Sequence, residues 1–267
     1  MIATGNDAIS EAIAARVGDL ITNTAANSPR SQQKRIGPSE VGDPCERKLT
    51  YKMYDWPTVN DGDPIASVLG IGFHAWMEEA FTAKQAVLPD GTPRYKIEQR
   101  VVVREGATED ATLAGSSDLY DRATGTVYDW KLTGTSSLDR YRRQGPGDQY
   151  RIQAHLYGLG QENAGEHPQR VAIVFVARYH ELRIHVWSEP YNRAVAEAAI
   201  ARLDRIRQQL FDLDPEAHPE RWSLIPTSEA AKCRFCPWLL PGSTDLSVGC
   251  PGADTTAQST QLEALIA

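Results

Sequence analysis

The segment from Gly115 to Lys131, GSSDLYDRATGTVYDWK, restricts the local fold more than any other part of the chain. Its two short runs of strand-forming residues are separated by a turn signal at Ala123-Thr124-Gly125. The segment therefore predicts a β-hairpin that brings Asp118 and the Asp129–Lys131 pair onto neighbouring strands. Because side chains alternate between the two faces of a strand, Asp129 and Lys131 should point to the same side.

Two carboxylates beside one lysine are able to hold a divalent cation. Mg²⁺ and Mn²⁺ prefer oxygen ligands and keep several waters, so Asp118 and Asp129 would suffice as anchors. The cation would polarise a phosphoryl oxygen and lower the pKa of a water, and the Lys131 ammonium would offset charge that develops in the transition state. This pattern predicts phosphodiester hydrolysis. The competing interpretation is a pair of surface charges across a hairpin, which is ordinary on sheets.

Three further features favour a functional site over paired surface charges. His74, on a predicted helix before the strands, can supply a nitrogen ligand, which would favour Mn²⁺ over Mg²⁺. Glu98, at the start of the first predicted strand, is either an extra acid or a solvated edge residue. Downstream, Gln149, Gln153 and Tyr157 recur at four-residue intervals, so on a helix they share one face that could hold DNA phosphate or base.

Length and net charge limit the number of domains and the kinds of partner that we expect. Its 267 residues can bury a full core, and we expect one elaborated domain over residues 1–267. The net charge of −7 argues against a large non-specific nucleic-acid surface, but a site built on carboxylates is itself acidic. No apolar run approaches the roughly 20 residues of a membrane helix, and the N-terminus lacks the order of a signal peptide. We therefore expect a cytoplasmic protein without a membrane partner.

The periodicity of apolar residues predicts the order of helices and strands. Helical patterns cover residues 6–21, 39–54, 67–84, 148–159 and 190–213. Strand patterns cover residues 95–104, 112–120, 126–132, 171–177 and 182–187, the last two as a hairpin around Tyr179-His180. This order predicts an α/β fold with a mixed central sheet flanked by helices. An N-terminal helical segment (1–90) would precede a catalytic core (91–213) and an irregular C-terminal segment (214–253), and the tail after Pro251 looks loosely held.

The four cysteines are distributed unevenly, because Cys45 is early whereas Cys233, Cys236 and Cys250 are late. Disulfides are disfavoured because nothing indicates secretion. Four thiolates can hold zinc, although zinc modules usually pair two close knuckles. They can also hold an iron–sulfur cluster, where a terminal Cys-Pro such as Cys250-Pro251 recurs. In either metal case a C-terminal clasp would close onto Cys45, and closing so long a loop removes much unfolded-state entropy.

The combination of these motifs resembles a known family. His74, the G-S-S-D ending in Asp118, the D-W-K from Asp129 to Lys131 and the Q-x-x-x-Y from Gln153 to Tyr157 resemble the RecB-like branch of the PD-(D/E)XK nuclease superfamily. The resemblance implies a restriction-endonuclease-like core. By it, His74, Asp118, Asp129 and the Trp130 carbonyl would hold the metal, Lys131 would be catalytic, and Gln153 and Tyr157 would complete the site. Ser117 stands where the family often has proline.

The cysteine distribution around this core resembles the iron–sulfur nucleases of the AddB type and the CRISPR-associated RecB-like exonucleases. That resemblance implies a structural [4Fe-4S] cluster held by Cys45, Cys233, Cys236 and Cys250. It also implies a Mg²⁺- or Mn²⁺-dependent exonuclease that acts on single-stranded DNA or DNA ends, in the cytoplasm of a bacterial or virus-infected cell. A homo-oligomer or recombination partner proteins would fit this role. A structure-specific endonuclease and a catalytically silent DNA-binding module are the alternatives.

Overall fold

The computed structural model describes residues 4–28, 33–60, 62–109, 111–179 and 181–253. The helices are α1 (Ala8–Ala26), α2 (Pro38–Val41), α3 (Glu46–Met53), α4 (Ile65–Ala83), α5 (Thr135–Gln144), α6 (Asp148–Asn163) and α7 (Arg193–Leu213). The strands are β1 (Tyr95–Arg104), β2 (Leu113–Asp121), β3 (Thr126–Thr133), β4 (Arg170–Ala177) and β5 (Ile184–Pro190). Two short 3₁₀ turns, Pro219–Leu224 and Cys233–Phe235, follow α7.

The five strands form one sheet in the order β1-β2-β3-β4-β5. Strands β1, β2 and β3 form an antiparallel meander, and β5 is antiparallel to β4. Strand β4 runs parallel to β3, so the chain crosses over between them through α5 and α6. The prediction of a mixed sheet flanked by helices in an α/β fold is confirmed.

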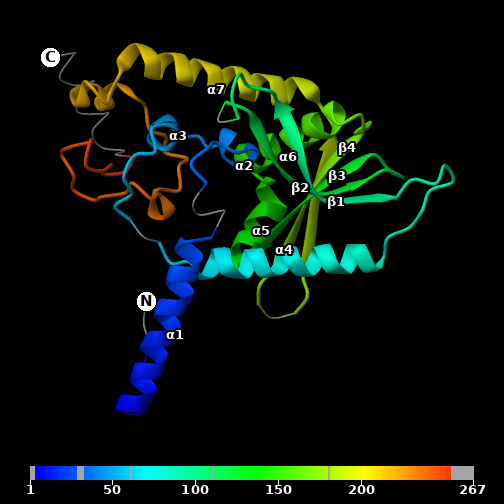
Figure 1. Cartoon of the computed structure of the whole chain (residues 1–267), viewed down its shortest axis with the longest axis horizontal. Helices are drawn as coiled ribbons and strands as arrows, with labels where there is room; N and C mark the ends of the chain where they lie inside the picture. Colours follow the sequence, from blue (N-terminus) through cyan, green and yellow to red (C-terminus); the bar gives the residue numbers. More distant parts are fainter. Residues whose placement is uncertain (1–3, 29–32, 61, 110, 180, 254–267) are drawn as a thin grey trace.

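Helices cover both faces of the sheet (Figure 1). Helix α6 packs on one face, with α7 packed on α6, and α4 lies across the opposite face. The period-two alternation of side chains divides the core accordingly. On the α6 side, Tyr120, Val127 and Phe175 are buried together, whereas Leu119 and Trp130 pack on the α4 side.

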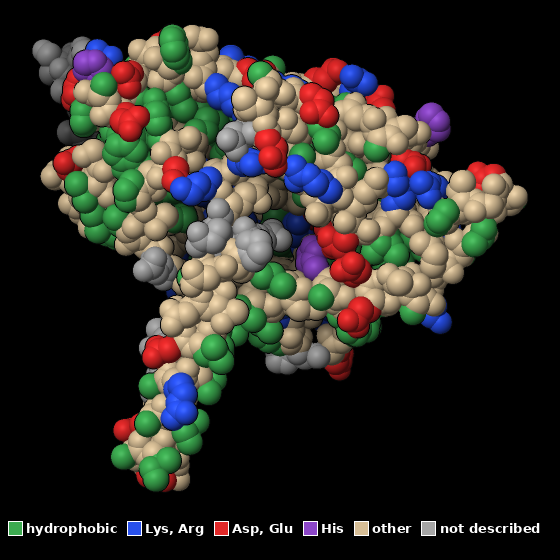
Figure 2. All heavy atoms as spheres, viewed as in Figure 1, with side chains coloured by type: hydrophobic (Ala, Val, Ile, Leu, Met, Phe, Trp, Pro, Cys, Tyr) green, Lys and Arg blue, Asp and Glu red, His purple; other side chains and the backbone are tan. Residues whose placement is uncertain are grey.

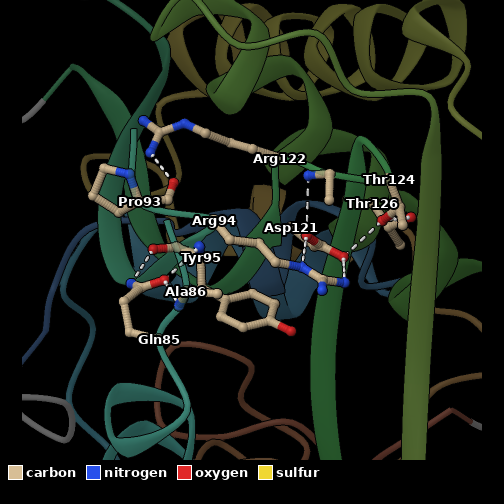
Figure 3. Close-up of polar contacts among 10 residues, drawn as sticks. Gln85, Ala86, Pro93, Arg94, Tyr95, Asp121, Arg122, Thr124 and Thr126 are labelled. Carbon is tan, nitrogen blue, oxygen red and sulfur yellow. Dashed lines mark hydrogen bonds and ion pairs between the residues drawn. The ribbon is translucent and has the colours of Figure 1, made fainter. Parts of the chain in front are cut away.

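The β2–β3 hairpin is pinned at its turn by Asp121 (Figure 3). The carboxylate of Asp121 accepts from Arg94 Nε at 2.8 Å and Nη2 at 2.9 Å. It also accepts from the Ala123 N–H and from Thr124 Oγ1, both within the turn. These bonds fix the register at this end of the hairpin, which in turn fixes where Asp118 lies relative to β3.

Two sequence predictions for the helices differ from the structure. The helix predicted within residues 39–54, beginning at Ser39 or at Asp43, is in the structure two helices, α2 and α3, since the ring of Pro44 disfavours helical backbone at Asp43. At Gly42 a Cβ would lie 2.8 Å from the Gln149 Cα, so this break also lets α2 approach α6 closely. Helix α5 was not predicted, because only two of its ten residues are buried and the segment is strongly polar.

The C-terminal segment packs on α3 through aromatic side chains. Tyr51 stacks on Trp222 at 4.3 Å between ring centroids and on Trp238 at 5.6 Å. Its hydroxyl donates to the Leu246 carbonyl at 2.5 Å. Residues 214–253 therefore close onto the Cys45 region through a buried aromatic cluster, independently of what the cysteines bind.

The described helices include none that is both long and apolar enough to span a bilayer. Helix α1 projects from the body (Figure 1), and none of its side chains is buried. Most of the predicted loose tail, residues 254–267, and His180 of the predicted β4–β5 turn lie outside the described residues.

Candidate metal and catalytic site

The site lies where β2 and β3 separate. The two strands pair only over Leu119–Asp121 and Thr126–Tyr128, next to the turn. One position further on, the Asp118 carboxylate replaces a backbone partner, since Asp118 Oδ2 accepts from the Trp130 N–H at 2.7 Å. A residue in a strand directs its N–H and C=O to the same side, so we expect the Trp130 carbonyl to face this gap as well. The gap therefore carries the Asp118 carboxylate, and the Trp130 carbonyl is expected beside it.

Asp129 and Lys131 lie on one side of β3, as their spacing predicts. Lys131 Nζ is 2.5 Å from Asp129 Oδ2. The other oxygen, Asp129 Oδ1, accepts from Gln153 Nε2 of α6 at 2.7 Å. The Asp129 carboxylate, which is 2% exposed, is thus contacted through both of its oxygens, and Lys131 lines the same cavity as Asp118.

Helix α4 and strand β1 complete a cluster of metal-ligating atoms around Asp118. His74 Nδ1 lies 3.5 Å from Asp118 Oδ1 and 3.6 Å from Glu98 Oε1. Ligand atoms of these three residues all lie within 4.8 Å of one another, and no other trio of described His, Cys, Asp or Glu side chains is gathered in this way. Of the predicted ligands, His74 and Asp118 belong to this cluster, whereas Asp129 lies beside it, held by Lys131 and Gln153.

Glu98 reaches the site because the backbone of β1 is distorted there. Its φ of 44° lies in the left-handed region, which is unfavourable for a residue with a side chain. Ile97 packs on the α4 side of the sheet but Val101 packs on the α6 side, although strict alternation would put both odd-numbered residues on one face. The left-handed backbone at Glu98 lies between these two positions, and the Glu98 carboxylate lies beside Asp118. Strained residues of this kind cluster at functional sites.

The electrostatics of the cluster favour a bound positive charge. Burial opposes protonation of His74, but hydrogen bonds to Asp118 and Glu98 outweigh it and raise the pKa of the imidazole to about 10. Burial raises the pKa of Asp129 to about 6, against the lowering effect of Lys131. Without a metal, a proton on His74 supplies the positive charge. Two oxygen donors and one nitrogen donor that attract a cation in this way fit a divalent metal ion.

A cavity of about 990 Å³ opens in front of these residues. Figure 2 shows the hollow on this face of the molecule, with basic side chains along one edge and acidic side chains and a histidine along the other. Besides Lys131, the lining includes the basic side chains of Lys34, Arg35 and Arg100. Sequence reasoning missed all three, because they are distant in sequence from the D-x-K motif and form no charge run.

The two glutamines on the predicted polar face of α6, Gln149 and Gln153, have different partners. Gln153 contacts Asp129, whereas Gln149 Nε2 donates to the Ser39 carbonyl at 3.1 Å and links α6 to α2. Tyr157, one turn beyond Gln153, lines the cavity and is nearly buried. Its hydroxyl lies 3.3 Å from where a Cβ at Gly115 would stand. Of the two glutamines, Gln153 is thus the one that lies beside Asp129.

The cysteines line a second, smaller cavity of about 20 Å³. Cys45, Cys233, Cys236 and Cys250 all border it, and none forms a disulfide. Burial raises the pKa of the Cys45 and Cys236 thiols, the latter to about 11. Arg47 Nη1 lies 3.7 Å from Cys250 Sγ. Four thiols beside a cationic side chain fit a site for a metal or cluster that is bound through thiolates.

The comparisons with known proteins find only distant structural similarity. No family model matches the chain, and no curated protein matches it. The solved structure of SSO0001 aligns with 90% of this chain and 98% of its own length, at 13% identity and a TM-score of 0.49. The alkaline exonuclease LHK-Exo from Laribacter hongkongensis aligns with 71% of this chain and 96% of its own, at 12% identity and a TM-score of 0.45. A phage-related exonuclease from Haemophilus somnus 129PT aligns with 68% and 96%, at 13% identity and a TM-score of 0.46. These similarities assign no role to any residue, and the resemblance to the iron–sulfur branch stays a prediction.

Proposed function

We propose that the protein is a divalent-metal-dependent deoxyribonuclease. The observation that carries this proposal is the convergence of His74, Glu98 and Asp118 beside the Lys131–Asp129 pair, in front of a large cavity with basic side chains on its wall. Surface charges paired across a hairpin would be exposed, but Asp118 and Asp129 are 6% and 2% exposed. Two buried carboxylates that face a common opening need a cation, and phosphate esters are the substrates that such a cation and a lysine activate together.

In this proposal His74, Glu98 and Asp118 hold the metal, with the Trp130 carbonyl and Asp129 as further oxygen donors. Mg²⁺ or Mn²⁺, when bound, supplies charge that polarises a phosphoryl oxygen and lowers the pKa of water. The Lys131 ammonium offsets the negative charge that develops on the phosphorus centre. Gln153 keeps Asp129 oriented, and the Asp129 carboxylate holds the Lys131 ammonium at the site. Lys34, Arg35 and Arg100 would contact the phosphates that flank the cleaved bond.

Within this class we propose an exonuclease that acts on single-stranded DNA or on DNA ends in recombination or DNA processing. The test uses end-labelled linear and circular single-stranded DNA with Mn²⁺, with Mg²⁺ and with chelator. Metal-dependent shortening of linear DNA, with circular DNA left intact, supports the proposal. Cleavage of circles would instead favour a structure-specific endonuclease of the same fold. Binding without cleavage under all conditions would favour a DNA-binding module.

We further propose that the four cysteines hold a [4Fe-4S] cluster rather than zinc. A single zinc ion at about 2.3 Å from each sulfur would draw the four thiolates within about 4 Å of one another. No three of the described cysteine sulfurs all lie within 4.8 Å of one another, and a four-iron cluster spaces its thiolates more widely than a zinc ion does. Iron and sulfide analysis of anaerobically purified protein, with its visible absorption, tests this assignment. Stoichiometric zinc without iron would contradict it.

A further inference from the structure

The candidate catalytic lysine and the cysteine segment meet at one aromatic ring. Lys131 Nζ lies over the ring of Tyr150, 5.0 Å from its centroid. Lys232 Nζ, which belongs to the residue just before Cys233, lies over the same ring at 5.4 Å. Both distances are within the roughly 6 Å at which an ammonium is attracted by the face of an aromatic ring.

The Tyr150 ring is held in place by its own neighbours. Tyr150 lies in the first turn of α6, directly after the crossover break at Gly147. Its ring packs against Tyr141 of α5 at 5.9 Å and against Phe175 of β4 at 6.2 Å between centroids. Two further elements of the α6-side core thus fix the ring, so its position does not depend on the lysines.

Lys131 has few other fixed contacts. Its four-carbon stem is flexible, and among the described residues the Asp129 carboxylate is the one anion within ion-pair distance of its ammonium. A single ion pair restrains distance but leaves direction free. The ring of Tyr150 adds a second restraint, and because the Lys131 side chain is only 19% exposed, the attraction is poorly screened by solvent.

We propose that Tyr150 is a positioning residue for Lys131, and that Lys232 links this ring to the cysteine segment. The proposal rests on the proposed function only for the kinetic consequence, because the contact itself can be measured without cleavage. In this arrangement the C-terminal segment contacts the candidate active site through Lys232 and Tyr150, whatever the cysteines bind. Loss of order around Cys233 would then loosen Lys131.

The direct test is nuclear magnetic resonance on protein labelled with ¹³C at the lysine ε carbons. The ring current of Tyr150 should shift the ε protons of Lys131 upfield, and the Lys131→Arg variant identifies the signal by its loss. We expect the upfield shift to persist in Tyr150→Phe and to vanish in Tyr150→Leu. An unshifted Lys131 signal in the unmodified protein, or one that stays shifted in Tyr150→Leu, would overturn the proposal.

The kinetic test separates positioning from binding. Tyr150→Leu should lower kcat about 5- to 30-fold, as expected for a partly desolvated cation–π contact, and leave KM within twofold. Tyr150→Phe, which keeps the ring, should retain most of kcat. Equal loss in both variants, or a change confined to KM, would contradict a positioning role of the ring.

The link to the cysteine segment has a matched control two residues away. Lys232 and Arg234 are both exposed cations of this segment, but Arg234 lies over Phe235 instead of Tyr150. Lys232→Met should move the Lys131 signal and lower kcat severalfold, whereas Arg234→Met should do neither. Identical behaviour of the two variants would refute the link. If Tyr150→Leu fails to fold, Lys232→Met still tests the link through the ring, because the Lys232 side chain is exposed and its replacement should leave folding intact.

These outcomes are distinguishable from failure of the proposed function. A protein that cleaves no DNA with any metal refutes the nuclease proposal, yet the Lys131 signal and its response to the variants still test the contact. A protein that cleaves DNA but whose Tyr150→Leu and Lys232→Met variants behave like the unmodified chain refutes the inference alone.

Discussion

Binding of Mn²⁺ should release a proton from His74. The pKa of about 10 means that the imidazole is protonated at neutral pH in the metal-free protein, whereas a metal ligand must be neutral. At pH 7 this gap of roughly three pH units costs about 4 kcal/mol of binding free energy. The cost falls as the pH rises, so the affinity for Mn²⁺ should increase about tenfold per pH unit between pH 7 and 8.5.

Isothermal titration calorimetry in buffers of different ionisation enthalpy measures both quantities. We expect about one proton released per Mn²⁺ and an affinity that rises across this window. The window begins at pH 7 because Asp129, whose pKa is about 6, also gains a proton below it. The His74→Gln variant should bind more weakly and without proton release. A pH-independent affinity in the unmodified protein, or the same slope in His74→Gln, would refute the assigned electrostatics.

The same pKa predicts the pH dependence of stability in the metal-free protein. Because folding raises the pKa of His74 above its ordinary value of 6.5, its contribution is full below pH 6.5 and is lost as the pH rises toward 10. Added Mn²⁺ should reverse this trend, since the metal then replaces the proton.

Three further predictions concern packing, orientation and the cysteines. Gly115→Ala would put a Cβ 2.9 Å from Pro38 Cδ and should destabilise the fold by about 1–3 kcal/mol in urea unfolding, whereas Gly72→Ala in α4, where a Cβ meets no atom within 4 Å, should not destabilise. Gln153→Leu removes the bond to Asp129 Oδ1 and should lower kcat at least about tenfold, while Gln149→Leu should affect stability alone. Cys233→Ala should abolish the visible absorption and lower the melting temperature if a cluster is bound; an unchanged spectrum would contradict its role as a ligand.

Much of the fold and of the site could be predicted from local pattern. The turn at Ala123–Gly125 fixes a hairpin, and the D-x-K spacing puts Asp129 and Lys131 on one side of a strand, because period two follows from strand geometry. The four-residue spacing on α6 likewise puts Gln153 and Tyr157 on one face of the helix. These features depend only on residues close in sequence.

The features that escaped prediction depend on tertiary structure. Glu98 enters the site through a left-handed backbone distortion in β1, which no local preference of glutamate favours. The cavity wall unites Lys34, Arg35 and Arg100 from distant segments. In the sequence, Tyr150 is not distinguished from the other polar residues of an amphipathic helix. Its contact with Lys131 depends on how α6 crosses β3.

The most direct measurement is DNA cleavage and Mn²⁺ binding in the same preparation of Lys131→Ala. Lys131 lies outside the His74, Glu98 and Asp118 cluster, so the variant should bind Mn²⁺ close to normally and yet fail to shorten end-labelled linear single-stranded DNA. The unmodified protein should do both, and chelator should abolish its cleavage. Full cleavage by Lys131→Ala would show that the lysine does not act in the reaction and would contradict the nuclease mechanism.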